Sequence, residues 1–315
     1  MSVKIAVLDL GSTSFHLSVV DASRDGRMER LLRRRETLHL AAAVARHGHL
    51  PDDLCDTAVR AVRMLRRAAD DAGPDFILAV ATSALRDAAN GGGLIDRLEV
   101  AARCRIRVLT GHEEARLAYR AVRESTSLGD GPLVVCDLGG GSLDVALGNG
   151  DDLMDDATFP LGASLLHASF VEKDPLTQAE CDAIADHVRS YVAEFAPSIA
   201  GVGSLAAAAT GGTARALGRL HANRAGLHPA TGRNVVVPAA SLFTMTSLLT
   251  SLSRAERLEL PAVRARRVDV LPVGALVLST LVESLDLGAL ALCEWGLREG
   301  VILEALEDLP ARATA

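Results

Sequence analysis

With 315 residues and a mass of 33.0 kDa, the chain is long for one hydrophobic core, which predicts two domains. Hydrophobic residues make up 49% of the sequence and charged residues 23%, a composition that excludes a disordered chain. The formal net charge of -7 argues against a nucleic-acid-binding protein, because such proteins need a basic face.

The first predicted element is a β-hairpin at residues 7–20, and its pattern returns at residues 135–148. In VLDLGSTSFHLSVV and VCDLGGGSLDVALG, an apolar run ends in Asp-x-Gly, crosses a short polar turn and re-enters an alternating apolar run. The matched positions are Asp9 with Asp137, Gly11 with Gly139, and Ser14 with Ser142. Two copies of one hairpin predict two duplicated lobes.

Helical and strand-like segments alternate between the hairpins, which is typical of an α/β fold. Helices are expected at residues 51–71, 94–103 and 113–123, and strands at 76–81 and 106–109. The polar loop 125–132 is the predicted hinge, so the lobes are predicted to be 1–127 and 128–315. The second lobe should continue with a helix at 178–200, a strand at 206–210, a helix at 214–220, and then mostly helix.

Cysteine usage and apolar stretches predict where the protein resides. The five cysteines are scattered without a CxxC pair, which is typical of reduced thiols in the cytoplasm. No signal peptide is expected, because the segment VKIAVLDLG is not followed by a cleavage site. The longest apolar stretch, residues 270–282, is shorter than the roughly 20 residues of a membrane span. We therefore expect a cytoplasmic protein without a membrane role.

The DLGGGS turn of the second hairpin has the composition of a phosphate-binding loop. Gly139, Gly140 and Gly141 carry no side chains, so successive backbone N–H groups could converge on a phosphate. Asp137 stands just before them and could hold Mg²⁺ or its water shell. A glycine-rich turn with an incidental Asp is the structural alternative. The matching DLGSTS turn in the first half makes coincidence the weaker interpretation.

A second glycine pair occurs in ATGGTA, between an Ala-rich strand and a helix. N–H groups of Gly211, Gly212 and Thr213 at a helix N-terminus would attract an anion, although an ordinary helix start has the same pattern.

Two further segments carry candidate catalytic side chains. Thr110 and Glu113 have the spacing of a capping box. Helix capping therefore explains Glu113 but does not explain Glu114. Arg86 follows a predicted strand, where a guanidinium could clamp a phosphate. A carboxylate favoured by the helix dipole and a surface arginine are the structural alternatives for Glu114 and Arg86.

Taken in order, six blocks resemble the Ppx/GppA family of exopolyphosphatases and guanosine pentaphosphate phosphohydrolases. The blocks are DLGSTSFHL, ATSALRDAAN, TGHEEARL, VCDLGGGSLDVALG, ATGGTARAL and DVLPVGALVL…WGLREGVI, and they cover nearly the whole chain. The resemblance is to the short form of the family, without the C-terminal HD-type domain. It implies an α/β fold of two ribonuclease H-like lobes, as in sugar kinases, heat-shock chaperones and actin, with a phosphate cleft between the lobes.

The resemblance also implies roles for individual residues. Glu114 would be the general base that activates water, and Arg86 would neutralise charge on the leaving chain. Mg²⁺, with Mn²⁺ as an alternative, would be held by Asp137, Asp144 and Asp9. The phosphates would be bound by Gly139, Gly140, Gly141 and Ser142, by Gly11, Ser12, Thr13 and Ser14, and by Gly211, Gly212 and Thr213. Asp144 and Thr13 depart from the family pattern, which commonly has Glu and often has Asn there.

The expected activity is release of terminal orthophosphate from inorganic polyphosphate. The alternatives are a guanosine pentaphosphate phosphohydrolase, a non-catalytic regulator that binds polyphosphate or an alarmone, and a sugar or carboxylate kinase of the same fold. The expected partners are polyphosphate or guanosine pentaphosphate, with no nucleic acid, no membrane and a homodimer as one assembly.

Overall fold

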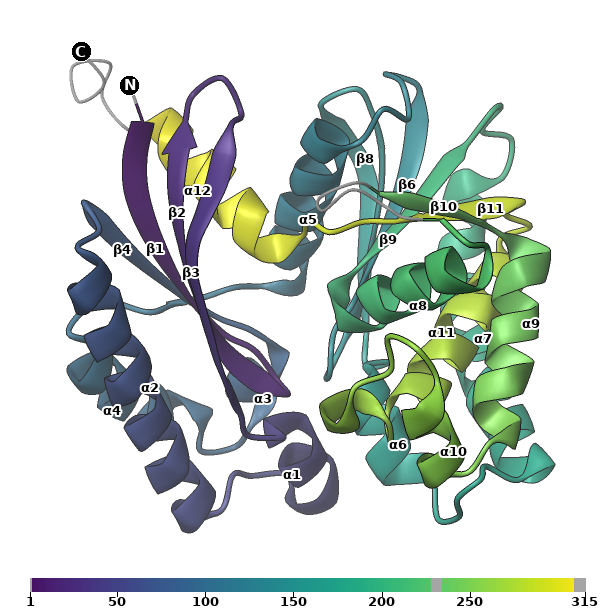
Figure 1. Cartoon of the computed structure of the whole chain (residues 1–315), viewed down its shortest axis with the longest axis horizontal. Coiled ribbons are helices and arrows are strands. Elements are labelled where there is room, and N and C mark those ends of the chain that lie inside the picture. Colours follow the sequence, from purple (N-terminus) through teal and green to yellow (C-terminus); the bar gives the residue numbers. More distant parts are fainter. Residues whose placement is uncertain (1, 228–233, 309–315) are drawn as a thin grey trace. The chain divides into compact units, whose positions relative to one another are not determined.

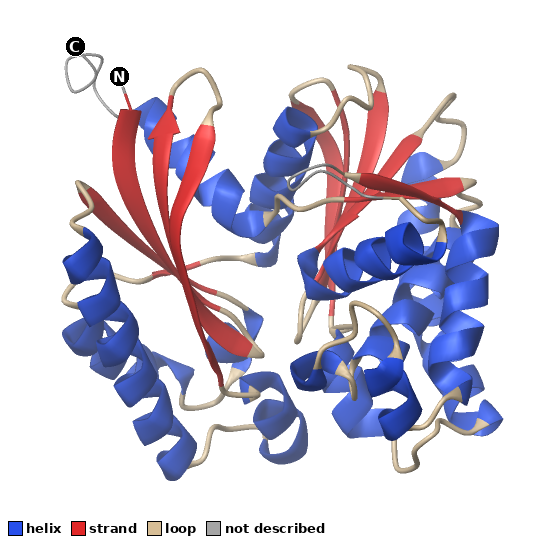
Figure 2. Ribbon diagram, viewed as in Figure 1, coloured by secondary structure: helices blue, strands red, loops and turns tan. Residues whose placement is uncertain are grey.

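The computed structural model describes residues 2–227 and 234–308, and the chain divides into two compact units. Unit 1 contains the chain up to Leu117 and again from Leu297 onward, and unit 2 contains Ala118–Gly296. Each unit is a mixed sheet covered by helices, as Figure 2 shows.

Unit 1 has a five-stranded sheet in the order β3-β2-β1-β4-β5. Its strands are β1 Ser2–Leu10, β2 Ser14–Ser23, β3 Met28–Thr37, β4 Phe76–Ala81 and β5 Arg107–Val108. Its helices are α1 Leu40–His47, α2 Asp52–Ala72, α3 Ser83–Asp87, α4 Gly91–Ala102, the first half of α5 Gly111–Ser125, and α12 Leu297–Asp308. Strand β1 runs antiparallel to β2 and parallel to β4, which produces the mixed sheet.

Strand β1 is apolar on both faces because helices cover both (Figure 1). Leu8 and Leu10 pack with residues of α2 and α4 on one face. Ile5 and Val7 on the other face pack with α5 and α12. The sheet of unit 1 is therefore closed by a helix from the far end of the described chain.

Unit 2 has a six-stranded sheet in the order β10-β11-β9-β6-β7-β8. Its strands are β6 Pro132–Leu138, β7 Leu143–Asn149, β8 Asp152–Phe159, β9 Ala206–Thr210, β10 Val235–Pro238 and β11 Ala289–Leu292. Its helices are α6 Ala163–Phe170, α7 Gln178–Ile199, α8 Gly211–Arg224, α9 Ala239–Ser251, α10 Arg254–Glu259, the 3₁₀ helix η1 Ala265–Arg267, and α11 Leu271–Ser284. The apolar helix α11 lies in the core between α7 and α9.

The two sheets repeat one topology, which confirms the predicted duplication. In unit 1 the antiparallel strands β1, β2 and β3 precede the parallel strand β4. In unit 2 the antiparallel strands β6, β7 and β8 precede the parallel strand β9. Both glycine-containing hairpin turns connect the first and second strands of this pattern.

The compact units differ from the predicted lobes 1–127 and 128–315 in two places. Helix α12 belongs to unit 1, because Val301, Ile302 and Leu306 pack on its sheet. Residues 118–127 belong to unit 2, where Tyr119 donates a hydrogen bond to the carbonyl of Gly150 at 2.8 Å.

The predicted hinge loop lies inside unit 2, and its backbone is held there. Arg123 donates hydrogen bonds to the carbonyl oxygens of Gly129 and Gly131 at 2.5 and 2.9 Å. Its guanidinium also stacks over the ring of Tyr119.

The prediction of mostly helix after residue 220 agrees with α9, α10, α11 and α12, but it missed strand β10 at residues 235–238 and strand β11 at 289–292. Strands β3 and β8 were missed as well, because both lie at sheet edges and carry many exposed charged residues. Within the described ranges, no helix combines the length and the apolar character that a membrane crossing requires.

Candidate functional site

The DLGGGS turn of unit 2 is shaped by its contact with the start of α6. The carbonyl oxygens of residues 139–141 accept hydrogen bonds from backbone N–H groups of residues 162–165, at 2.9–3.3 Å. In a trans peptide the C=O and the following N–H point in opposite directions. The N–H groups of Gly140, Gly141 and Ser142 therefore point away from α6. Successive N–H groups that point to one side form an anion-binding concavity.

This arrangement depends on a glycine outside the motif. Gly162 precedes α6, and a Cβ atom there would overlap the backbone of Gly140 and Gly141. Only a residue without a side chain lets the turn approach the helix this closely. Sequence reasoning missed Gly162, because a single glycine after a strand has no distinctive spacing.

Two carboxylates flank the turn on neighbouring strands. Asp137 on β6 and Asp144 on β7 are directly opposite each other in the antiparallel register, so their side chains leave the same face of the sheet. Asp144 is 4% exposed, and Ser142 donates a hydrogen bond from Oγ to its Oδ2 at 3.1 Å. The glycine turn and the carboxylate pair thus form one constellation in unit 2.

The donor set of this constellation fits Mg²⁺ bound together with a phosphate. The described residues contain no group of three or more His, Cys, Asp or Glu side chains that could hold a metal alone. Mg²⁺ is usually bound by one or two carboxylates, with water and substrate phosphate completing its octahedron. Asp137 and Asp144 supply such a pair.

The ATGGTA segment begins α8 beside Asp137. Strand β9 pairs with β6 so that Thr210 lies next to Asp137, and Gly211 follows with φ of +97°. A Cβ on Gly211 would overlap the carbonyl of Leu138 and lie 3.0 Å from Asp137 Oδ1. The first N–H groups of α8 have no partners within the helix and carry its positive dipole end. Glycine is therefore required at position 211, where the start of α8 meets strand β6, which carries Asp137.

The other two members of this segment have different surroundings. Arg267 of η1 lies directly against Gly212, where its guanidinium occupies the place of a side chain. Thr213 is 1% exposed, and its side chain fills the space against Gly274 of α11. The side chain of Thr213 is thus enclosed by its neighbours. Sequence reasoning did not find Arg267, because 54 residues separate it from Thr213.

In unit 1, the DLGSTS turn is connected to neighbouring elements through its serine hydroxyl. Ser12 is buried, its Oγ lies 2.8 Å from Ser83 Oγ, and it accepts a hydrogen bond from the Ala84 N–H at 2.9 Å. Asp9 at the end of β1 lies 3.8 Å from the guanidinium of Arg298 in α12. The side chain of Ser12 therefore forms hydrogen bonds with the start of α3. Asp9 has the guanidinium of Arg298 beside it.

The remaining residues of this turn are also engaged. The carbonyl of Thr13 accepts hydrogen bonds from the N–H groups of residues 38 and 39, before α1, and Ser14 Oγ accepts one from Arg35 at 2.6 Å. A Cβ on Gly11 would lie 3.0 Å from the carbonyl oxygen of Ser14. His16 stands opposite Asp9, in the place that Asp144 takes opposite Asp137. The carboxylate pair is thus not repeated in unit 1.

The predicted base and the predicted phosphate clamp contact each other in unit 1. Arg86 Nη1 lies 2.6 Å from Glu114 Oε1 and donates another hydrogen bond to the carbonyl of Leu109 at 2.7 Å. The Glu114 side chain is 5% exposed, and that of Arg86 is 24% exposed. Burial lowers the pKa of Arg86, but the hydrogen bonds and negative charges of Glu114 and Asp87 together outweigh burial, so its pKa lies above the ordinary value. Arg86 is thus a permanent cation that orients Glu114.

Glu113 has the capping role that its spacing predicts. Its carboxylate accepts a hydrogen bond from the Thr110 N–H at 2.8 Å, and Thr110 Oγ1 accepts one from the Glu113 N–H at 3.2 Å. The Thr110 N–H and the guanidinium of Arg107 lower the pKa of Glu113 to about 2. The capping box is therefore confirmed, and the two adjacent glutamates have different surroundings.

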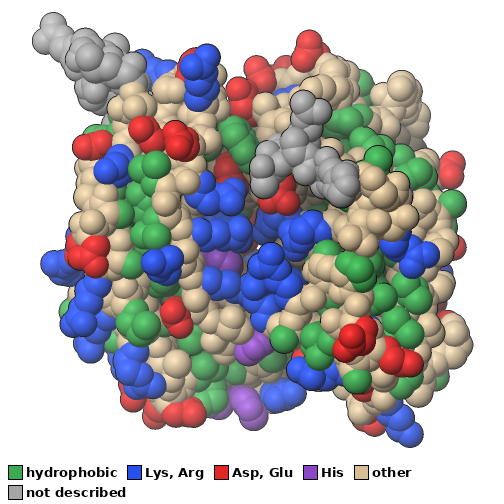
Figure 3. Space-filling model, in the orientation of Figure 1, with side chains coloured by type: hydrophobic (Ala, Val, Ile, Leu, Met, Phe, Trp, Pro, Cys, Tyr) green, Lys and Arg blue, Asp and Glu red, His purple; other side chains and the backbone are tan. Residues whose placement is uncertain are grey.

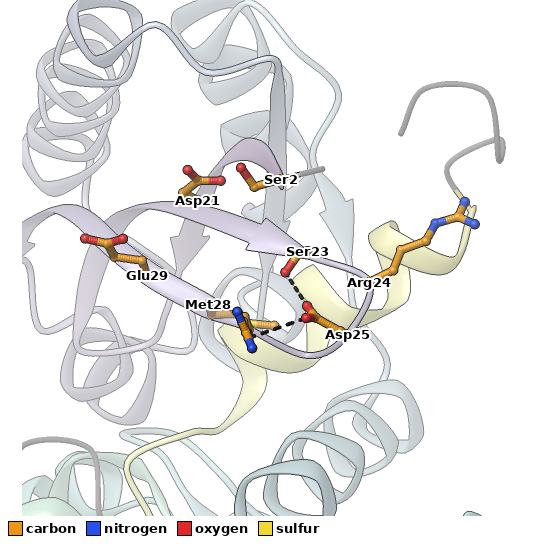
Figure 4. A pocket seen from close by; sticks show the side chains of 8 residues that line it. Ser2, Asp21, Ser23, Arg24, Asp25, Met28 and Glu29 are labelled. Carbon is orange, nitrogen blue, oxygen red and sulfur yellow. Dashed lines mark hydrogen bonds and ion pairs between the residues drawn. The ribbon is translucent and has the colours of Figure 1, made fainter. Parts of the chain in front are cut away.

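A pocket elsewhere in unit 1 contains none of the predicted site residues. It lies at the β2–β3 turn, has a volume of about 830 Å³ and is lined by charged residues that include Asp21, Asp25 and Glu29 (Figure 4). Asp25 accepts a hydrogen bond from Ser23, which lowers its pKa. Its wide opening and mixed charge give it no feature of a phosphate site.

Comparisons with known proteins identify relatives of the chain. The Ppx/GppA phosphatase family model matches residues 19–309. Exopolyphosphatase 1 of Mycobacterium tuberculosis is 31% identical over 310 residues, which cover 97% of this chain and 89% of that protein. Exopolyphosphatase 1 of Mycobacterium leprae is 29% identical over the same length, with 97% and 90% covered.

Solved structures show the same fold over nearly the whole chain. An exopolyphosphatase of Cytophaga hutchinsonii has a TM-score of 0.89 at 22% identity, covering 98% of this chain and 99% of its own. The Aquifex aeolicus member of the Ppx/GppA family has a TM-score of 0.81 at 25% identity, covering 98% and 100%. With the family model matching most of its length, the chain belongs to the Ppx/GppA phosphatase family.

Proposed function

We propose that the protein is an exopolyphosphatase that releases terminal orthophosphate from inorganic polyphosphate. The observation that supports this most is the DLGGGS turn, whose contact with α6 directs three successive N–H groups to one side, next to Asp137 and Asp144. Such donors suit a phosphate oxygen whose charge stays high throughout the reaction. Membership of the family, with relatives named exopolyphosphatase at about 31% identity, supports the same reaction.

In the proposed reaction, Glu114 takes a proton from water as the water oxygen bonds to the terminal phosphorus. The bond from that phosphorus to the bridging oxygen breaks, which releases orthophosphate and a chain shorter by one phosphate. Arg86 orients Glu114 and offers positive charge to the departing chain. Asp137 and Asp144 would hold Mg²⁺, which neutralises phosphate charge when bound.

Burial suits Glu114 for this task. Its carboxylate is nearly inaccessible to bulk water, and the ion pair with Arg86 fixes its direction at 2.6 Å. Geometry of this kind favours a single ordered water as the proton donor. We place the reaction in the cytoplasm, because the cysteines of the chain are free thiols.

The test is phosphate release from long-chain polyphosphate and from guanosine pentaphosphate at equal terminal-phosphate concentration, with and without Mg²⁺. The proposal expects Mg²⁺-dependent release from polyphosphate, with the higher kcat/KM for polyphosphate. A higher kcat/KM for guanosine pentaphosphate would contradict the substrate assignment. Tight polyphosphate binding without release would show a binding protein that regulates a partner.

A further inference from the structure

A glutamate of α12 contacts the chain on both sides of the candidate base. Glu304 Oε2 accepts a hydrogen bond from Arg107 Nη1 at 2.5 Å, and its Oε1 accepts one from Arg116. Arg107 lies on β5, before Glu114 in the chain, and Arg116 lies on α5, two residues after Glu114. We call Arg107, Glu304 and Arg116 the Glu304 bridge. The bridge therefore spans the segment that carries Glu114.

Opposite charges are common on this protein, so an ion pair alone indicates no function. Figure 3 shows acidic and basic side chains spread over the visible face of unit 1, and exposed pairs of this kind contribute little to stability. The side chain of Glu304 is only 21% exposed. Burial raises its pKa, but the hydrogen bonds and charges of Arg116 and Arg107 lower it by more, so this pKa lies below the ordinary value. The carboxylate is therefore ionised at neutral pH and contacts both guanidiniums at once.

The helices α12 and α5 approach each other closely beside the bridge. A Cβ on Gly300 would lie 2.1 Å from the carbonyl oxygen of Leu117, so only glycine allows this contact. Gly300 and Glu304 are one helical turn apart and therefore share the face of α12 that meets α5. Leu117 and Val301 belong to one buried core. The close approach and the Glu304 bridge together fix α12 against the first two turns of α5.

The segment between the two arginines contains both groups that contact Arg86. Glu114 Oε1 lies 2.6 Å from Arg86 Nη1, and the carbonyl of Leu109 accepts a hydrogen bond from the same nitrogen at 2.7 Å. Both acceptors move with the backbone of residues 107–116. A displacement of about 1 Å in a catalytic group can cost on the order of 10²-fold in rate. The direction of the Glu114 carboxylate therefore depends on what holds this backbone.

We propose that Glu304 is a positioning residue for the reaction, which holds the segment that carries Leu109 and Glu114 in place against α12. The inference rests on the proposed function. Glu113 also pairs with Arg107, but loss of Glu113 leaves the Glu304 bridge intact. Loss of Glu304 instead releases both arginines from α12 at once.

The test is Glu304→Gln in the full chain. Glutamine keeps the shape of the side chain but offers one acceptor oxygen, so it can contact only one of the two arginines. We expect kcat on polyphosphate to fall about tenfold, less than the full loss because Arg86 still contacts Glu114, with KM within about twofold of wild type. The matched control is Asp308→Asn, which removes one charge from the exposed end of the same helix and should leave both values unchanged.

A double variant decides whether Glu304 acts through the base. On the Glu114→Gln background, Glu304→Gln should not lower the residual rate any further, because the group that it positions is already absent. A further tenfold fall on this background would overturn the proposal. A wild-type kcat for Glu304→Gln would also overturn it, and so would an equal fall for Asp308→Asn.

Hydrogen exchange tests the Glu304 bridge without catalysis. If folded wild type releases no phosphate from any substrate, the proposed function fails, but the bridge still predicts protection of the amides in residues 109–116. Faster exchange of these amides in Glu304→Gln than in Asp308→Asn would then support the bridge, and equal exchange would refute it.

Discussion

Neighbouring residues in the first turn of α5 have different tasks. Glu113 caps the helix and pairs with Arg107 at 2.5 Å, whereas Glu114 is buried against Arg86. We predict that Glu114→Gln lowers kcat on polyphosphate by about a hundredfold or more, since general bases contribute roughly 10²–10⁴-fold. Steady-state phosphate release measures the loss, and polyphosphate binding should persist.

The control is Glu113→Gln in the same turn. It should cost about 1 kcal/mol of stability through the capping box and change kcat little. If Glu114→Gln keeps the wild-type rate, Glu114 is not the base.

Asp144 allows a prediction on metal use, because its carboxylate is shorter than the glutamate common in the family. If Asp144 shares the metal with Asp137, wild type should be activated by Mn²⁺ at least as well as by Mg²⁺, which demands stricter geometry. Asp144→Glu should shift the preference toward Mg²⁺, and Asp144→Asn should weaken activation by both. Rates against metal concentration test this, and unchanged metal dependence in Asp144→Asn would remove Asp144 from the site.

At this scale the sequence shows which residues belong to a motif but not what their side chains contact. The DLGSTS and ATGGTA patterns point to Ser12 and Thr213, but both side chains face inward, toward Ser83 and Gly274. Arg267 reaches Gly212 only through the packing of α11 against α8. Such contacts depend on tertiary packing, which no local pattern encodes.

Among the elements, α6 is expected to be the most sensitive to a small change at its first residues. Gly162→Ala would place a methyl group into the backbone of Gly140 and Gly141, so the turn must move away from the helix. We predict a loss of about 1–3 kcal/mol in unfolding free energy, as for overpacked sites, together with weaker phosphate-chain binding. Urea unfolding and equilibrium binding measure the two effects.

Its matched control is Gly93→Ala in α4, where a Cβ meets no atom within 4 Å. The free energy of unfolding of this variant should rise by up to about 1 kcal/mol, because alanine favours the helix more than glycine does. If both variants lose stability and binding to the same extent, the close approach at Gly162 is not the cause.

Glu180 at the start of α7 predicts a pH dependence of stability. Backbone N–H groups of Glu172 and Thr177, each at 2.7 Å, lower its pKa from 4.5 to about 2. Because the pKa of Glu180 is lower in the folded state, its ionised carboxylate stabilises the fold at pH values above the unfolded-state pKa. This stabilisation is lost as the pH falls from about 4.5 to 2. Glu180→Gln should therefore be less stable than wild type at pH 6, with the difference shrinking toward pH 2. Urea midpoints at both pH values test this, and a constant difference would contradict it.

Two strands made of continuous apolar runs are among the elements that the sequence predicts well. The strands at 76–81 and 206–210 match β4 and β9 residue for residue, because continuous apolar runs bounded by polar residues are distinctive. Strand β3, MERLLRRRET, has no alternation to follow, since only its pairing with β2 orders it. Strand β11, ALAL, consists of strong helix formers, and its place between β9 and β10 overrides their preference.

On the scale of the whole molecule, the separate cores predict separate responses to mutation. Ile302 of α12 is fully buried against the sheet of unit 1, and Leu281 of α11 is fully buried in unit 2. Replacing either residue by alanine should lower the free energy of unfolding by about 2–5 kcal/mol. Hydrogen exchange should accelerate in β1 for Ile302→Ala and in β9 for Leu281→Ala. If Ile302→Ala accelerates exchange in β9 as much as in β1, the two units unfold together.

The return of α12 to unit 1 has a consequence for synthesis on the ribosome. Chains usually fold from the N-terminus, with the first domain complete while the rest is still being made. Here the last residue of unit 2 is Gly296, and the helix that covers Ile5 and Val7 follows it. Unit 1 therefore finishes folding after unit 2 has been synthesised, and one face of its sheet is covered only in part, by α5, until residues 297–308 have emerged.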